Sequence, residues 1–346
     1  MLHLIRRRRF SWILVAILGF AGLAWPTHSL AQDSAVRARI EEDWTNLEAE
    51  KEATVHLEIA AVKPFVGRVV WGLAIGNATI ARGDSAIEVA VGGRKSLPIK
   101  IAAQSTRSGT FLEMKLAVAT YMNGGRQSVA SIERKYWVLP ADPFADRRQW
   151  AKKLRAVLYD PKGSTAEILR KADFPFVEQR NLAALGELTE GTAILAEGLS
   201  WREEPGIEEV VWKLAERGVR VLCLAPTEGT FSVSGLSKKG RNDITRMTFA
   251  STDIIASWDG RLDAGTWSGG VPSVASRVSV QGEGTDAMAV FGPDRGWPWA
   301  EVRVGRRGAK QGVVAVCGFG VMRRWDEGPT PRHVFLRALE SITENK

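Results

Sequence analysis

The hydrophobic pattern of this chain changes its period near residues 140–150, and this change restricts the possible folds more than any other feature. In the N-terminal part apolar and polar residues alternate, as in Val55–Ile59, Ile87–Val91 and Leu97–Ile101. Beyond Trp150, continuous apolar runs alternate with segments of helical pattern. Alternation with a period of two residues is typical of antiparallel strands with one solvent-exposed face. Apolar runs separated by helices instead indicate parallel strands that are buried on both faces. Because 346 residues also exceed what one core usually holds, we predict two domains.

The first domain is predicted over residues 32–140. Six or seven short strands are separated by turn signals such as Gly76-Asn77, Gly83-Asp84 and Gly92-Gly93, in which glycine and asparagine permit the dihedral angles of tight turns. The segment Ala35–Glu52 has a short, charged helical pattern and is expected to be a lead-in. This spacing of strands, without a convincing long helix, favours an antiparallel β-sandwich of immunoglobulin-like type.

A linker is predicted over residues 141–150. The run Leu139–Asp146 holds two prolines and two acids directly after the last strand, which marks a boundary. Phe144 and Trp150 are apolar enough to pack against a neighbouring domain. We therefore expect a docked connection and not a free tether.

The second domain, residues 151–346, is predicted to be α/β, with a mostly parallel sheet covered by helices on both faces. Strands are expected at Leu154–Tyr159, Phe174–Glu178, Ala193–Leu199, Arg220–Ala225, Ala287–Phe291, Trp299–Val304 and Gly312–Cys317. Helices are expected at 164–172, 207–217 and 330–342. Ser164 and Glu167 match a capping box for the first helix, and Thr330-Pro331 match the start of the last. In such sheets ligands bind outside the carboxyl ends of the strands.

The first 31 residues read as a secretory signal. Arg6–Arg9 form a positive region, Phe10–Trp25 an apolar run, and Ser29–Ala31 a small-residue cleavage pattern. Cleavage after Ala31 would place the protein in the periplasm or outside the cell, whereas an uncleaved segment would anchor it to a membrane. Loss of the four arginines lowers the formal net charge from +8 to +4.

The charge pattern gives little support for a nucleic-acid partner, because Lys and Arg are interleaved with Asp and Glu and form no basic stripe. The cluster Arg303, Arg306, Arg307 and Lys310 is expected to be a solvated hairpin. The partner itself stays unknown at this stage, with an envelope protein or a glycan as the candidates.

Metal and cofactor sites are not expected. Only His56 and His333 lie beyond the signal, which disfavours a multi-histidine metal site. The glycines at 282–284 do not lie between a strand and a helix, as a dinucleotide-binding loop must. Cys223 and Cys317 each lie in an apolar run, so two buried free thiols are favoured over a disulfide.

Two segments carry a resemblance to a known family. Glu216–Ala225 is similar to the helix, glycine and strand that lead to the nucleophile of class I glutamine amidotransferases, and Gly312–Ile342 resembles that family's closing strand, catalytic loop and last helix. The resemblance implies a flavodoxin-like fold for the second domain. The family requires a cysteine thiolate activated by a histidine, but those positions fall on Ala225 and near Gly318 or Phe319. The resemblance therefore implies the fold without the catalytic residues.

The segment 228–284 is rich in glycine and is expected to be a long irregular insertion. Its tryptophans could stack on sugars or be buried under loops. A vestigial cleft at the strand ends is predicted to be lined by Glu197, Trp201, Ala225, Glu228 and Arg323. We therefore expect an exported, non-catalytic binding or scaffolding protein of the cell envelope. The alternative is a hydrolase that uses acids of the insertion, such as Glu228 or Asp259.

Overall fold

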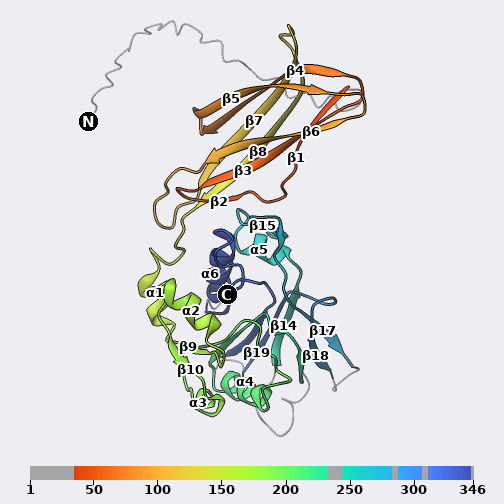
Figure 1. The fold of residues 1–346 in the computed structure, drawn as a ribbon. Coiled ribbons are helices and arrows are strands. Elements are labelled where there is room, and N and C mark those ends of the chain that lie inside the picture. Colours follow the sequence, from red (N-terminus) through yellow and green to blue (C-terminus); the bar gives the residue numbers. More distant parts are fainter. Residues whose placement is uncertain (1–34, 233–243, 283–286, 306–310, 344–346) are drawn as a thin grey trace, which may run out of the picture. The chain divides into compact units, whose positions relative to one another are not determined.

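The computed structural model describes residues 35–232, 244–282, 287–305 and 311–343 (Figure 1). Residues Ala35–Lys346 group into one compact unit, in which strands predominate and helices are few. The signal segment expected at 1–31 and three of the basic residues, Arg306, Arg307 and Lys310, lie outside the described residues. No helix in the described part of the chain is long and apolar enough to span a membrane.

The N-terminal part forms two sheets. The three-stranded sheet has the order β1-β3-β6, with β1 at Val36–Ile40, β3 at Glu52–Ala61 and β6 at Arg94–Ala102. The five-stranded sheet has the order β2-β8-β7-β4-β5, with β2 at Asn46–Glu48, β8 at Ser128–Leu139, β7 at Leu112–Met122, β4 at Phe65–Ile75 and β5 at Ala78–Val89. The pairs are antiparallel except β2 with β8, which is parallel.

Both N-terminal sheets contribute to one hydrophobic core. Leu57 and Ile59 of β3 meet Val69 of β4, Leu116 of β7 and Tyr136 of β8 in this core. The alternation that the sequence shows places every second residue of these strands inside. The predicted antiparallel sheets are thus present, with more strands than expected.

Two predictions in this part were wrong. The segment Ala35–Glu52 contains β1 and β2 and no helix, because Val36, Ala38 and Ile40 alternate toward the core instead of following a helical period. Gly83-Asp84 is no turn but lies within β5. Gly83 faces the indole of Trp71, where an added Cβ would lie 2.6 Å from Cζ2, so the glycine makes room for that ring.

A seven-stranded sheet follows, with the order β10-β9-β11-β12-β20-β19-β14. These strands are β9 at Ala156–Tyr159, β10 at Val177–Gln179, β11 at Thr192–Leu195, β12 at Arg220–Leu224, β14 at Ile244–Ala250, β19 at Trp299–Val304 and β20 at Gly312–Cys317. The strands β10, β9, β11, β12 and β20 are parallel to one another. Taken in chain order, these five are arranged second, first, third, fourth and fifth.

The prediction of a mostly parallel sheet needs correction, because the sheet is mixed. β19 is antiparallel to β20, and β14 is antiparallel to β19. Only residues 305–311 separate β19 from β20, and a parallel return needs a crossover of a dozen residues or more. An apolar run in the sequence indicates that a strand is buried but not in which direction it runs. The hydrophobic pattern therefore could not show that β19 is antiparallel to its neighbours.

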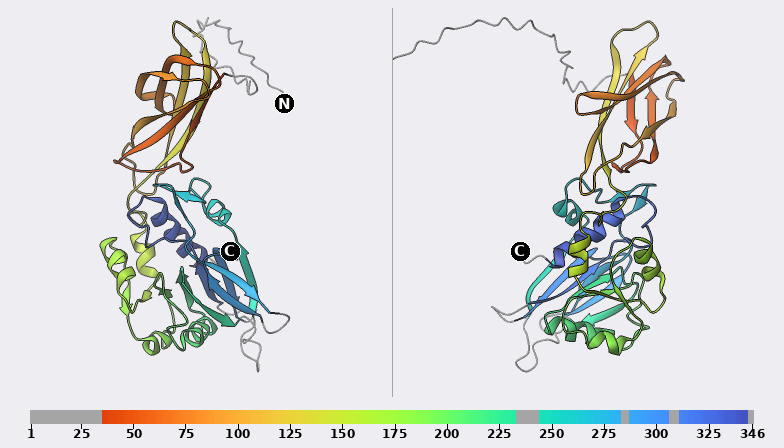
Figure 2. Two further views of the ribbon diagram at one scale, coloured as in Figure 1. Left: turned by 45° about the vertical axis from the view of Figure 1, so that its right-hand side comes forward. Right: turned by 90° about the vertical axis from the view of Figure 1, so that its left-hand side faces the viewer.

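Helices cover both faces of the mixed sheet (Figures 1 and 2). The helices are α1 at Arg148–Lys153, α2 at Ser164–Lys171, α3 at Leu182–Gly186, α4 at Ile207–Glu216, α5 at Asp253–Trp258 and α6 at Thr330–Thr343. Residues of α1, α2, α5 and α6 share a core with Leu222 and Leu224 of β12. Residues of α3 and α4 share the opposite core with Val221 and Cys223 of the same strand.

The insertion expected to be irregular is largely structured where it is described. It contains α5 and β14, and a short antiparallel pair of β15 (Thr266–Trp267) with β16 (Val271–Pro272). A small antiparallel sheet of order β13-β18-β17 also forms here, from Gly229–Ser232, Met288–Gly292 and Arg277–Gln281. Its apolar side joins the core on the side of α4.

The capping box predicted for α2 is absent. The N-cap residue is Gly163, and no side chain of the cap bonds to the helix. The carboxylate of Asp160 accepts hydrogen bonds from the N–H groups of Gly163 and Ala166, both at 2.8 Å. In the segment predicted to be a docked linker, Phe144 is fully buried against Phe174 and Phe335.

Candidate functional site

The carboxyl end of β12 is the place where the sequence resemblance puts a nucleophile. Ala225 is fully buried there and has a backbone φ of +31°, a region that non-glycine residues rarely adopt. Its N–H donates to the carbonyl of Cys317 at 2.7 Å, and its carbonyl accepts from the N–H of Gly198 at 3.2 Å. A nucleophile elbow runs from a strand into a helix, whereas β12 is followed by β13.

The segment Ser273–Ser276 covers this strand end. The N–H groups of Ala275 and Ser276 both donate to the carbonyl of Gly318, at 2.8 and 2.9 Å, and the N–H of Gly320 donates to Ser273. A Cβ on Gly318 would lie 2.1 Å from the carbonyl oxygen of Ser276. Of the two positions that the resemblance gives for the histidine, Gly318 therefore has no room for a side chain, and the other holds the buried ring of Phe319.

Both cysteines are free and buried, as the sequence favoured. Burial raises the pKa of both thiols, in the case of Cys317 to about 12. Cys223 pairs with Val316 and Cys317 with Leu224 in the sheet register, so the two thiols point to opposite faces and cannot bond to each other. Neither is a reactive thiolate.

Glu197 and Arg323, two residues of the predicted cleft, lie together. The Nε of Arg323 donates to the Glu197 carboxylate at 2.5 Å, and that carboxylate also accepts the backbone N–H of Met322 at 2.7 Å. The N–H of Glu197 itself donates to Thr165 Oγ1 at 3.1 Å. The side chain of Glu197 is buried, and its carboxylate holds the loop after β20 through Met322 and Arg323.

Trp201 and Glu228 form a second pair, joined through the backbone by a 2.9 Å hydrogen bond from the Trp201 N–H. Trp201 is a core residue and does not line a cleft, because it packs on Phe231 and Phe291 with 5% of its surface exposed. Glu228 is half exposed and lies 3.6 Å from Arg202. Four of the five predicted cleft residues therefore form two contacting pairs, Glu197 with Arg323 and Trp201 with Glu228. The fifth, Ala225, is buried.

Asp160 occupies the point between β9 and β11 where the strand order reverses. In doubly wound sheets this crevice receives ligands, and a helix N-terminus there binds anions. Here the buried Asp160 carboxylate already bonds to the first turn of α2. The chain's own carboxylate takes the place that a ligand anion would need.

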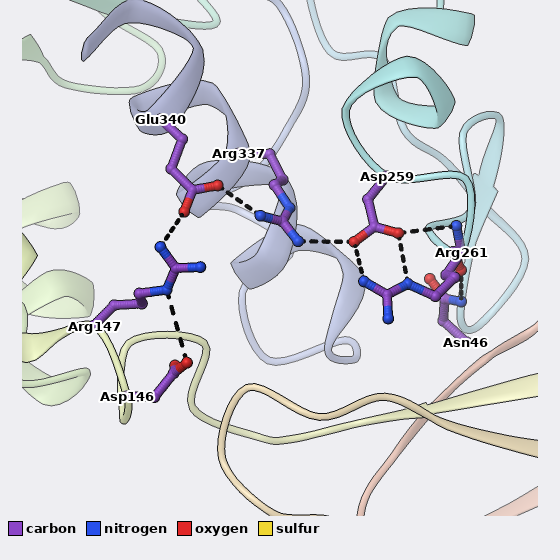
Figure 3. A network of polar contacts seen from close by, with 7 residues as sticks. All are labelled: Asn46, Asp146, Arg147, Asp259, Arg261, Arg337 and Glu340. Carbon is purple, nitrogen blue, oxygen red and sulfur yellow. Dashed lines mark hydrogen bonds and ion pairs between the residues drawn. The ribbon is translucent and has the colours of Figure 1, made fainter. Parts of the chain in front are cut away.

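The acid of the hydrolase alternative, Asp259, belongs to a network of charges (Figure 3). Its carboxylate accepts hydrogen bonds from Arg261 at 2.7 and 2.8 Å and from Arg337 Nη2 at 2.8 Å. Burial alone would raise the pKa of Asp259, but these hydrogen bonds outweigh burial and lower the pKa to about 2. Such a group cannot deliver a proton near neutral pH.

The same network continues to a cavity that the sequence analysis missed. Arg337 Nη1 donates to Glu340 at 2.6 Å, and Arg147 lies 3.2 Å from the other oxygen of Glu340. The cavity has a volume of about 340 Å³ and its charged lining consists of Arg147, Arg246, Arg303, Arg337, Glu301 and Glu340. These residues come from distant parts of the sequence, so no local motif could have revealed them.

No protein-family model and no curated protein matches the sequence. Among solved structures, similar chains include a cycloisomaltooligosaccharide glucanotransferase of Paenibacillus sp. (9% identity, TM-score 0.30, covering 74% of this chain and 34% of that chain). An alkylpurine DNA glycosylase of Pseudomonas fluorescens has 12% identity and a TM-score of 0.22 over 30% of each chain. The sporulation control protein of Bacillus subtilis has 14% identity and a TM-score of 0.23, covering 34% of this chain and 54% of that chain. This chain thus spans about half or less of each protein's length, and at these scores the likeness carries no argument.

Proposed function

We propose that this chain is an exported, non-catalytic binding or scaffolding protein of the cell envelope. It consists, in this proposal, of an immunoglobulin-like sandwich over 32–140, a linker over 141–150 and a degenerate amidotransferase-like domain over 151–346. Export is argued from the sequence of residues 1–31, with its arginines, apolar run and cleavage pattern.

The observation that carries the non-catalytic assignment is the end of β12. Ala225 stands at the position of the nucleophile, buried and with a positive φ. The two positions that the resemblance gives for the activating histidine hold Gly318, which leaves no space for a side chain, and a buried Phe319. Acyl transfer by such a site needs a nucleophile and its base within hydrogen-bonding reach. Neither reactive group is present at this strand end.

Two features support an amidotransferase-like ancestry of the second part. The five parallel strands have the order of flavodoxin-like sheets, in which the chain's second strand lies at the edge beside the first. The left-handed conformation of Ala225 is also the kind of strained backbone that positions a nucleophile. Ala225 keeps this backbone conformation although it carries no reactive side chain that the conformation would position.

The test is an activity assay on the mature chain with glutamine and with chromogenic ester and glycoside substrates. We expect no turnover, either for the wild type or for Ala225→Cys, because a thiol at that position would have no histidine beside it. Turnover by the wild type that is lost in Glu228→Gln would overturn the proposal in favour of the hydrolase alternative. The N-terminal residue of the protein purified from its envelope fraction tests export, since cleavage after Ala31 leaves Gln32 first.

A further inference from the structure

The arginine-lined cavity lies where the edge of the mixed sheet meets two helices. Arg246 on β14 and Arg303 on β19 supply the sheet side, and Arg337 on α6 supplies the helix side. Trp258 at the end of α5 also lines the cavity. Its volume of about 340 Å³ falls in the range of small-ligand pockets.

The sheet side holds two like charges in direct opposition. Arg246 and Arg303 are partners in the antiparallel register of β14 and β19, an arrangement that destabilises a sheet when the charges are not compensated. Arg303 Nε donates to Glu301 at 2.6 Å, and within the described residues its two Nη groups make no ion pair with another carboxylate. Arg246 is exposed, and its side chain makes no ion pair or hydrogen bond within the described part of the chain.

The acidic residues around the cavity form ion pairs with arginines other than Arg246. Glu340 lies between Arg147 and Arg337, and Arg337 is shared with Asp259. Arg147, Arg303 and Arg337 each have a carboxylate partner. Among the described residues, the lining arginine left without such a partner is Arg246, so its charge is uncompensated. An anion between Arg246 and Arg303 would offset the repulsion that the fold otherwise retains.

The kind of anion follows from the chemistry of the walls. A guanidinium offers planar, paired donors that match the two oxygens of a carboxylate or phosphate group. The partly exposed indole of Trp258, held edge-on to Trp299 with ring centroids 4.8 Å apart, gives the cavity an apolar wall on which a ring can pack.

We propose that this cavity binds a small organic anion that bears a carboxylate or phosphate on a compact ring. The anionic group lies between Arg246 and Arg303, and the ring packs on Trp258. The site is separate from the strand end at Ala225, and it deepens the binding role proposed above, on which it rests.

The experiment is calorimetric titration of the mature chain with glucuronate, glucose 6-phosphate and glucose, which share a ring and differ in charge. We expect at least one of the two anions to bind and neutral glucose not to bind; which anion binds identifies the group. Arg246→Ala should weaken binding at least about tenfold, because it removes a charge-assisted hydrogen bond. Arg82→Ala is the matched control, since Arg82 is an exposed strand arginine of β5, and it should leave binding unchanged.

Three results would overturn the inference: binding of neither anion, binding of glucose as tight as that of the anions, or unchanged affinity in Arg246→Ala. Because Arg246 is exposed, its substitution should leave the fold intact, and a circular dichroism spectrum checks this. The turnover assay is a separate measurement, so failure of the anion site and failure of the non-catalytic assignment can be told apart.

Discussion

At the scale of single residues, the environment of His333 couples its protonation to folding. It is buried in α6, its Nε2–H donates to the carbonyl of Pro140 at 3.0 Å, and its ring stands edge-on to Phe111. Burial lowers the pKa of His333 to about 4, although the hydrogen bond to Pro140 acts in the opposite direction. The imidazole is therefore neutral in the folded chain.

This depressed pKa predicts acid sensitivity. Between about pH 6.5 and pH 4 the unfolded chain binds a proton at His333 that the folded chain does not bind. The stabilisation is complete above pH 6.5 and is lost as the pH falls toward 4, by up to about 3 kcal/mol. Urea unfolding at pH 7 and pH 4 should show a clearly smaller loss for His333→Gln than for the wild type. Equal losses in His333→Gln and the wild type would contradict this origin.

The roles that the sequence could not predict belong to residues whose contacts are with residues far away in the chain. The two thiols could be predicted to be buried and free, since each lies in an apolar run. That Gly318 excludes a side chain depends on Ser276, and that Arg246 opposes Arg303 depends on the pairing of β14 with β19. Neither contact leaves a local pattern in the chain.

At the scale of elements, the sequence predicted helices and strands well where burial and end signals agree. The helices α4 and α6 and the strands β12 and β20 lie within one or two residues of the expected bounds. Strand direction, and the strands of the insertion, could not be predicted because pairing partners decide them. The start of α2 shows the same limit, since its capping group lies outside the motif that the sequence suggested.

The start of α2 gives a test at this scale. Asp160→Ala removes two hydrogen bonds to the first turn and should lower the free energy of unfolding by about 2 kcal/mol. Ser164→Ala should change it by less than about 0.5 kcal/mol, because Ser164 is exposed and no side chain of the cap bonds to the helix. Chemical denaturation of both variants shows which side chain stabilises the start of α2. A larger effect for Ser164→Ala than for Asp160→Ala would support the capping box that the sequence predicts.

At the scale of the whole molecule, a buried asparagine joins the N-terminal sheets to the rest of the compact unit. The Asn46 Nδ2 donates to the carbonyl of Arg261 at 2.7 Å, and its Oδ1 accepts from the Asp263 N–H and from Thr330 Oγ1, both at 2.9 Å. Asp263 in turn accepts the backbone N–H of Asn46 at 2.7 Å. These reciprocal bonds link β2 to the insertion and to the start of α6.

This link predicts cooperative unfolding that depends on one side chain. Asn46→Ala leaves one buried and two partly buried polar groups without their Asn46 partner, which should cost about 3 kcal/mol, near 1 kcal/mol for each group. We expect the wild type to unfold in a single transition, because residues Ala35–Lys346 form one compact unit, and the variant to separate into two. Far-ultraviolet circular dichroism follows the whole chain, and tryptophan fluorescence mainly follows the mixed sheet and its surroundings, so coincident curves indicate one transition. Asn123→Ala, in the exposed turn between β7 and β8, is the control; coincident and unshifted curves for Asn46→Ala would show that the two parts are held together by other contacts.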